Sequence, residues 1–132
     1  MIITVFVINF SFDSSEIENN ILFHATLADP DLYTNGVYID KFTINKGEYF
    51  FRFVPNGSSP EVLSITLDGG NFDFSENFKL EGISHQTGIS EYFTWNYNGQ
   101  KIISISNTQE VSITINPNEN ITGSVTVDIL EN

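Results

Sequence analysis

Cysteine is absent from the 132 residues of this chain. Disulfide bonds, thiolate nucleophiles and cysteine metal sites are therefore excluded together. No stretch reaches the ~18 consecutive apolar residues of a membrane-spanning helix, so membrane insertion is not expected. The apolar residues 1–10 (MIITVFVINF) lack the basic start and the small-residue cleavage site of a signal peptide.

Basic side chains are scarce. Five lysine and arginine residues stand against 17 aspartate and glutamate residues, which gives a formal net charge of -12 at pH 7. Nucleic acids and anionic membrane surfaces are bound through clusters of lysine and arginine. The composition therefore predicts neither a nucleic acid nor a membrane as partner, while the negative charge favours solubility and attracts divalent cations.

Catalytic motifs are missing as well. The two histidines, His24 and His85, belong to no nucleophile elbow, zinc-binding H-E-x-x-H run or phosphate-binding glycine loop. The acidic residues leave room for a pair of carboxylates that hydrolyses glycosides, but solvated surface charge is their commoner role. We therefore predict that the protein is not an enzyme.

The chain does contain short runs in which apolar and polar residues alternate, bounded by turn residues. Such alternation is typical of half-buried β-strands. It is clearest in residues 48–54 and 62–67, on either side of a loop rich in proline and glycine. These two runs predict an antiparallel hairpin, which extends into a three-stranded meander over residues 37–67.

Further strands are predicted at residues 2–12, 21–28, 72–80, 92–97, 101–106, 110–115 and 124–130. The pair Asn98-Gly99 predicts a tight hairpin between its flanking strands. Residues 75–77 indicate a bulge, and residues 81–90 a loop. The predicted core is Tyr49, Phe51, Phe53, Leu63, Ile65, Leu67, Val111, Ile113, Val125 and Val127.

About nine or ten short strands without a helix predict one all-β domain over residues 1–132, an antiparallel β-sandwich. Its topology is either that of a jelly roll or immunoglobulin-like, and the pattern does not separate the two.

Residues 1–12 form an apolar segment whose alternation places apolar side chains on both faces of a strand. A strand of this kind needs cover on both faces, either in its own sheet or in the sheet of a neighbouring copy. Repeated head to tail, strand exchange builds an open filament. The predicted contact residues are Ile2, Ile3, Val5, Phe6, Val7, Ile8, Phe10 and Phe12.

This segment, in a small acidic sandwich without cysteine, resembles in architecture the subunits of extracellular prokaryotic fibres that assemble by donor-strand exchange. The resemblance implies a secreted or surface-exposed structural protein that forms homo-oligomers or filaments. A viral surface or capsid jelly roll fits the same pattern.

A binding module is the alternative. Asp29, Asp31 and Asp40 near one loop, and Asp68 and Asp73 near another, offer oxygen ligands for calcium, although ordinary acidic turns are commoner. Calcium is the one cofactor that the sequence raises.

Carbohydrate is the other ligand of this alternative. Trp95 and Tyr97 share one face of their strand and would stack on sugar rings if that face were exposed. A single tryptophan in a sandwich more often lies in the core. The sequons at Asn9, Asn56 and Asn120 favour a location outside the cell, and their use stays open.

Overall fold

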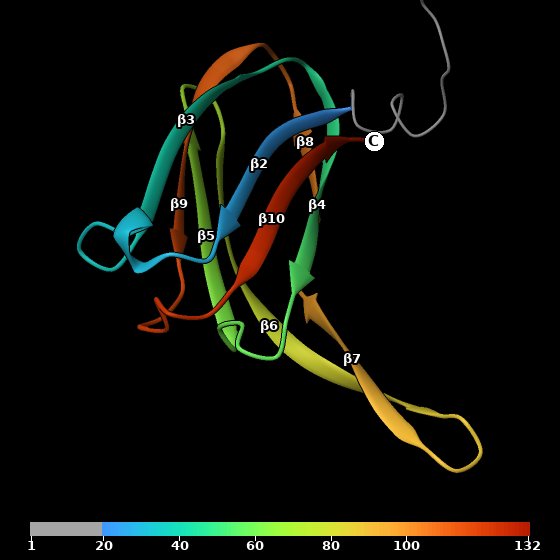
Figure 1. The fold of residues 1–132 in the computed structure, drawn as a ribbon. Coiled ribbons are helices and arrows are strands. Elements are labelled where there is room, and N and C mark those ends of the chain that lie inside the picture. The colour runs from blue at the N-terminus through green and yellow to red at the C-terminus, as the bar shows by residue number, and fades with distance from the viewer. Residues whose placement is uncertain (1–19) are drawn as a thin grey trace, which may run out of the picture.

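The computed structural model describes residues 20–132, which form nine β-strands and one short 3-10 turn, η1 (Pro30–Leu32) (Figure 1). The strands are β2 (Ile21–Leu27), β3 (Tyr38–Ile44), β4 (Gly47–Pro55), β5 (Val62–Gly69), β6 (Asp73–Gln86), β7 (Glu91–Asn98), β8 (Ile102–Ile105), β9 (Gln109–Asn116) and β10 (Val125–Glu131). They make two antiparallel sheets, a four-stranded one in the order β2-β10-β4-β8 and a five-stranded one in the order β3-β9-β5-β6-β7. The predicted all-β sandwich is confirmed.

The strand order is that of a jelly roll. With β7 set aside, the first strand pairs with the last, the second with the last but one, and so inward: β2 with β10, β3 with β9, β4 with β8, and β5 with β6. This is a long hairpin folded over on itself into two sheets, the double-sheet arrangement of jelly rolls. β7 is an additional strand at the edge of the five-stranded sheet.

The core lies between the sheets, where the alternating apolar residues of both inner faces meet. All ten predicted core residues contribute to it, with Phe53 partly buried and the others buried. Aromatic rings from opposite sheets touch, since Phe51 lies 5.4 Å from Phe78 and Phe53 lies 5.1 Å from Tyr97 between ring centroids. Such contacts add to the burial of apolar area that stabilises the sandwich.

The hairpin predicted at the centre of the chain is wrong. β4 pairs with β10 and β8, whereas β5 pairs with β6 and β9, so the two strands lie in different sheets. The loop between them crosses from one sheet to the other, and the meander over residues 37–67 does not form. Alternation identifies a strand and its inward face, but it does not identify the partner of that strand.

The hairpin predicted at Asn98-Gly99 is also wrong, because β7 and β8 belong to different sheets. Here the chain crosses past the ring of Phe78, and a Cβ on Gly99 would lie 2.7 Å from a ring carbon of that residue. The carbonyl of Lys101 then accepts a hydrogen bond from the Phe51 N–H (2.9 Å). Glycine is needed at this position for the close approach of the crossing chain to the core.

Two further predictions, both about the region of β6, are wrong. The register of β6 with β5 is unbroken from Asp73 to Lys79, so no bulge forms at residues 75–77. Residues 81–86, predicted as part of a loop, continue the strand because they pair with β7. Only Thr87 to Ser90 remain as a turn, closed by a hydrogen bond from the Thr87 N–H to the Ser90 carbonyl (2.9 Å).

Residues 1–19 lie outside the described residues, and so does the predicted strand over residues 2–12. The described chain begins beside its own end, since the Asn20 carbonyl accepts a hydrogen bond from the Glu131 N–H (2.9 Å). We call this end of the sandwich, near the label C in Figure 1, the entry end. Residues 20–132 contain no helix long and apolar enough to cross a membrane.

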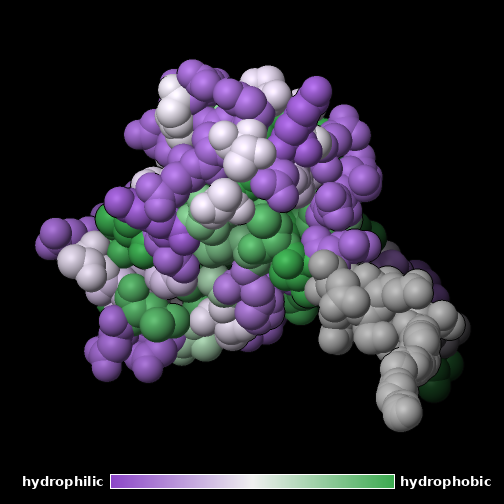
Figure 2. Space-filling model, turned by 90° about the horizontal axis from the view of Figure 1, so that it is seen from above, coloured by the Kyte–Doolittle hydropathy of each residue, from purple (hydrophilic) through white to green (hydrophobic). Residues whose placement is uncertain are grey.

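Figure 2 views the molecule from the entry end. Hydrophilic side chains cover most of this view, as expected for a chain with a net charge of -12. Hydrophobic side chains gather in the middle of it. This end of the sandwich therefore presents an apolar area surrounded by hydrophilic side chains.

Candidate functional site

The distal halves of β6 and β7 project beyond the sandwich as a two-stranded ribbon (Figure 1). We call residues 81–96 the arm. None of its residues is buried. A two-stranded ribbon on its own is marginally stable in water.

The root of the arm is held by Leu80 and Tyr97, which face each other across the two strands. Tyr97 is completely buried, and its hydroxyl donates a hydrogen bond to the Pro60 carbonyl (2.5 Å). Burial raises the pKa of Tyr97, so this hydroxyl keeps its proton at neutral pH. Tyr97 therefore anchors the root of the arm in the core.

One face of the arm, the aromatic face, continues the inner face of the sheet. Trp95 lies over Gly82, where a Cβ would come within 2.8 Å of the indole ring. An aromatic side chain that covers a glycine of the neighbouring strand is a known stabilising device in sheets. The ring of Phe93 lies next to the indole, 6.2 Å away between centroids. Trp95 is 43% exposed and Phe93 54%.

The opposite face of the arm also carries apolar groups. Ile83 and Tyr92 are each about half exposed. The Tyr92 ring stacks on His85, with centroids 4.8 Å apart, and His85 Nε2 shares a hydrogen bond with the Thr94 hydroxyl (2.8 Å). Ile89 at the tip is fully exposed. Apolar surface thus lies on both faces and at the tip.

Among residues 20–132, β7 is an edge strand whose outward backbone groups have no hydrogen-bond partner. The Leu80 N–H donates to the Glu61 carbonyl (2.8 Å), away from β7, so Leu80 and Tyr97 form a pair without mutual hydrogen bonds. Backbone groups alternate in direction along an antiparallel strand. Phe93 and Trp95 therefore point their N–H and C=O groups away from β6, towards open solvent.

The edges of the described sandwich differ in how they are protected. Native edges are blunted by shortness, charge or proline. β8 has four residues, and β3 carries Asp40 and Lys41 in its middle. Neither β2 nor β7 contains proline, and neither carries an acidic or basic side chain in its middle apart from His24. The exposed residues of β2 are His24 and Thr26, whereas β7 presents half-exposed aromatic side chains. β7 is therefore the apolar one of these two edges.

Charge is sparse on the arm. Its acidic and basic side chains are Glu81, His85 and Glu91. The Glu91 carboxylate accepts a hydrogen bond from the Ser84 hydroxyl (2.5 Å). Between Glu91 and the root, β7 itself carries no acidic or basic side chain.

The two residues predicted as a sugar platform are separated by the end of the sandwich. Trp95 and Tyr97 share a face of β7 as predicted, but Tyr97 is buried while Trp95 is exposed. The expectation that the single tryptophan lies in the core is therefore wrong. The exposed aromatic pair is Phe93 and Trp95.

The five aspartates predicted for calcium are dispersed. Asp29 caps η1 by accepting a hydrogen bond from the Asp31 N–H (2.9 Å), while Asp40 lies on the edge strand β3. Asp68 and Asp73 face each other at the turn between β5 and β6. Within residues 20–132, no three acidic or histidine side chains gather in a way that holds a metal ion. Calcium binding stays a prediction from the sequence.

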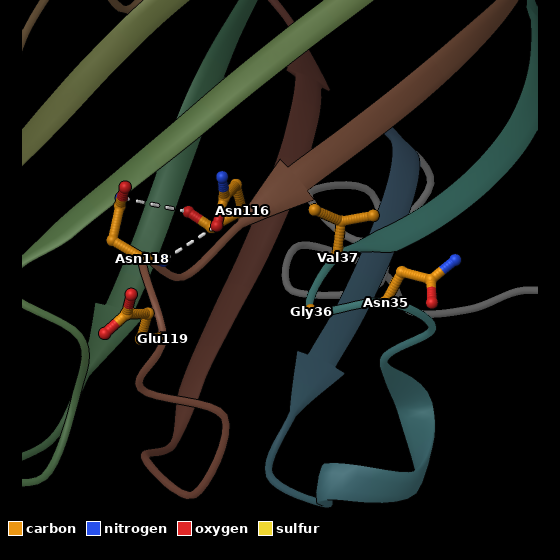
Figure 3. A pocket seen from close by; sticks show the side chains of 6 residues that line it. All are labelled: Asn35, Gly36, Val37, Asn116, Asn118 and Glu119. Carbon is orange, nitrogen blue, oxygen red and sulfur yellow. Dashed lines mark hydrogen bonds between the residues drawn. The ribbon is translucent and has the colours of Figure 1, made fainter.

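A hollow of about 300 Å³ lies beside the loop between β9 and β10 (Figure 3). Positive φ angles occur at three of its non-glycine residues, Asn35 (54°), Asn118 (55°) and Glu119 (80°). The polar groups of Asn118 close the loop, because its N–H donates to Asn116 Oδ1 (2.8 Å) and its amide donates to the Val62 carbonyl (2.8 Å). No lining residue has a buried side-chain polar atom without a partner. The polar groups around the hollow are therefore accounted for by the hydrogen bonds that close the loop.

A buried carboxylate lies on the outer face of the four-stranded sheet. Asp128 on β10 is 1% exposed. One of its oxygens accepts from Arg52 Nη2 (2.8 Å) and Nε (3.1 Å), and the other lies 2.5 Å from His24 Nδ1. The Thr26 hydroxyl lies 3.4 Å from His24 Nε2.

Hydroxyl, imidazole and carboxylate thus follow one another as in hydrolase triads. A triad also needs donors for the oxyanion, and the backbone N–H groups of the central strands β10 and β4 are used in the ladders. Thr26 and His24 line none of the hollows described among residues 20–132. We therefore interpret the cluster as a set of polar contacts that links the strands β2, β10 and β4.

The sequons fall in different settings. Asn9 lies outside the described residues. Asn56 is exposed in the loop after β4, whereas the Asn120 amide donates to the Ser58 carbonyl (3.2 Å) and its oxygen accepts from the Gly123 N–H (3.0 Å). Asn56 is thus the more accessible acceptor of the two.

The arm combines exposed apolar groups on both faces with an unprotected edge, and it presents no catalytic group arrangement. Its chemistry is that of a contact surface. Comparisons with family models, with curated proteins and with solved structures find no match to this chain.

Proposed function

We propose that this protein is a non-catalytic structural module that assembles with copies of itself through the arm. The observation that carries the proposal is the edge of β7, which is unprotected and apolar on both faces. Strand addition at such an edge supplies main-chain hydrogen bonds, and the side chains beside it supply specificity. A third strand would also complete the ribbon that is marginal with two.

The size of the apolar surface favours strand addition over side-by-side contact. The three half-exposed aromatic residues Tyr92, Phe93 and Trp95 offer on the order of 300 Å² of open side-chain area. A stable interface buries about 800 Å² on each partner. Side-chain contact alone therefore falls short, and backbone pairing along β7 supplies the remainder.

Assembly also depends on charge. Two chains of net charge -12 repel each other, and salt screens that repulsion beyond about 10 Å at 0.1 M. We therefore expect the extent of assembly to increase with ionic strength. A surface or extracellular location, in a fibre or in a viral shell, agrees with the exposed Asn56 sequon.

The test places a lysine on the acceptor edge. Thr94→Lys puts a charge in the middle of β7, and Thr43→Lys makes the same change on β3, the other edge strand of the same sheet. Both threonines are exposed, so the pair is matched in residue type, charge and setting. We expect sedimentation velocity to show concentration-dependent oligomers for the natural chain and for Thr43→Lys, but monomers for Thr94→Lys.

Glycan binding is the second candidate function, and the aromatic face supports it. Two neighbouring exposed rings, Phe93 and Trp95, lie beside the hydroxyl of Ser84 and the carboxylate of Glu91, groups that stack on and hydrogen-bond to sugars. Titration of soluble polysaccharides against the fluorescence of Trp95 tests it. A Trp95→Phe variant screened on immobilised glycans keeps an aromatic ring and serves as the comparison for Trp95→Ala.

A further inference from the structure

We propose that assembly is head to tail, and that the edge of β7 in one copy accepts residues Ile2–Phe12 of the next copy as an added strand. This inference rests on the proposed function and names the segment that occupies the acceptor edge. Three observations support it: the positions of the two partners on the sandwich, the apolar character of both faces, and the distribution of charge.

The chain enters the sandwich at the end opposite to the arm. Asn20 is bonded to Glu131, which pairs with Tyr49 at the start of β4. The root of the arm lies at the other end, where Tyr97 packs on Phe53 near the end of β4. Tyr49 and Phe53 are four residues apart, about 13 Å along β4. Figure 1 shows the same arrangement, with the label C at one end and the arm at the other.

Capture of the segment by the arm of the same copy would need an almost fully extended connection. The residues between Phe12 and Asn20 extend to at most about 27 Å. The connection has to run around the sandwich, because the straight path from Asn20 to the arm root leads through the packed core. The arm of another copy can be reached without this extension, and a copy that captured its own segment would stay monomeric.

The donor and the acceptor match in their apolar character. Residues Ile2–Phe12 alternate with apolar side chains on both faces, for example Phe6 on one and Val7 on the other. A strand added to β7 has Phe93 and Trp95 beside it on one face and Tyr92 on the other. A strand that is apolar on both faces fits an edge with apolar groups on both faces.

Charge supports the same pairing. The segment Ile2–Phe12 contains no aspartate, glutamate, lysine, arginine or histidine, and β7 contains none after Glu91. The two strands therefore meet without the repulsion that the remaining acidic surface imposes. Because donor and acceptor lie at opposite ends of one chain, the contact is heterologous and repeats into a filament.

The experiment separates the donor from the acceptor within full-length chains. Thr94→Lys blocks the acceptor edge and leaves the donor intact. Phe6→Asp combined with Val7→Asp puts one carboxylate on each face of the donor and leaves the acceptor intact. Asn9→Asp combined with Ser11→Asp adds the same charge to the same segment at positions that are already polar, and it is the matched control. Far-UV circular dichroism and thermal unfolding establish that each variant is folded.

Head-to-tail assembly predicts that each blocked variant is a monomer on its own and that their mixture forms a 1:1 dimer that grows no further. The control variant assembles like the natural chain. Oligomers formed by the donor-blocked variant alone would overturn the inference and indicate pairing of β7 with β7, with the proposed function intact. Two folded monomers whose mixture forms no dimer would overturn it too. A natural chain that stays monomeric at all concentrations would instead contradict the proposed function itself.

Discussion

Replacement of Gly82 by alanine is expected to displace the indole of Trp95 from the arm. A Cβ built on Gly82 lies 2.8 Å from Cζ3 and 3.0 Å from Cη2 of the ring. Contacts this short do not persist, so the ring has to move. Because Trp95 is already 43% exposed, it moves outward into solvent rather than into the core.

The expected change in stability is small, because two effects oppose each other. A little more than half of the Trp95 surface is buried, on the order of 100 Å², which corresponds to about 2.5 kcal/mol. Loss of the part that rests on Gly82 costs about 1 kcal/mol. Alanine in a strand regains roughly 0.5–1 kcal/mol relative to glycine. The free energy of unfolding therefore changes by less than about 1 kcal/mol.

Fluorescence reports the displacement directly, since Trp95 is the only tryptophan. We expect a red-shifted emission maximum and stronger acrylamide quenching for Gly82→Ala. Gly70→Ala is the control, because a Cβ at Gly70 meets nothing within 4 Å, and both signals should match those of the natural chain. An unchanged spectrum for Gly82→Ala would refute the placement of the indole over Gly82.

Three further predictions concern the sandwich itself. Tyr97→Phe is expected to lower the free energy of unfolding by about 1 kcal/mol at neutral pH, because it removes a hydrogen bond. Burial raises the pKa of Tyr97, so the stability that this tyrosine contributes is complete below pH ~10 and is lost at higher pH. In urea unfolding, the free energy of unfolding of the variant should therefore decline less at alkaline pH than that of the natural chain. Arg52→Met leaves Asp128 buried with one partner fewer, and calorimetry should show a loss of about 2–4 kcal/mol; a loss below ~0.5 kcal/mol would contradict the role of the pair. Gly123→Ala brings a methyl group into the Ser58 carbonyl, and a destabilisation of at least about 1–3 kcal/mol is expected in the same assay.

The sequence predicts the strands and their inward faces better than their partners. Alternation at Tyr49 and Phe51 or at Leu63 and Ile65 reports local contact with the core, and the structure buries all four. Partner choice is a property of the whole jelly roll, in which the chain passes to the opposite sheet after every described strand except β5 and β6. The turn signal at Asn98-Gly99 was misleading for this reason, since a tight turn there changes sheets.

The candidate site was only partly predictable. Trp95 and Tyr97 have the same parity, and nothing in the sequence marks the point between them at which the opposing sheet ends. The length of β6 was the missing signal, because Glu81 to Gln86 resemble a loop in composition and become a strand by pairing with β7. An aromatic run that faces polar residues such as Ser84 and His85 is the pattern that indicates an exposed arm.

The most direct test of self-assembly is sedimentation velocity of the full-length chain over a range of concentrations, with Thr94→Lys and Thr43→Lys run beside it. The account predicts oligomers that grow with concentration for the natural chain and for Thr43→Lys, and a monomer for Thr94→Lys. Equal behaviour of the two lysine variants, or a natural chain that is monomeric throughout, would contradict assembly through the edge of β7.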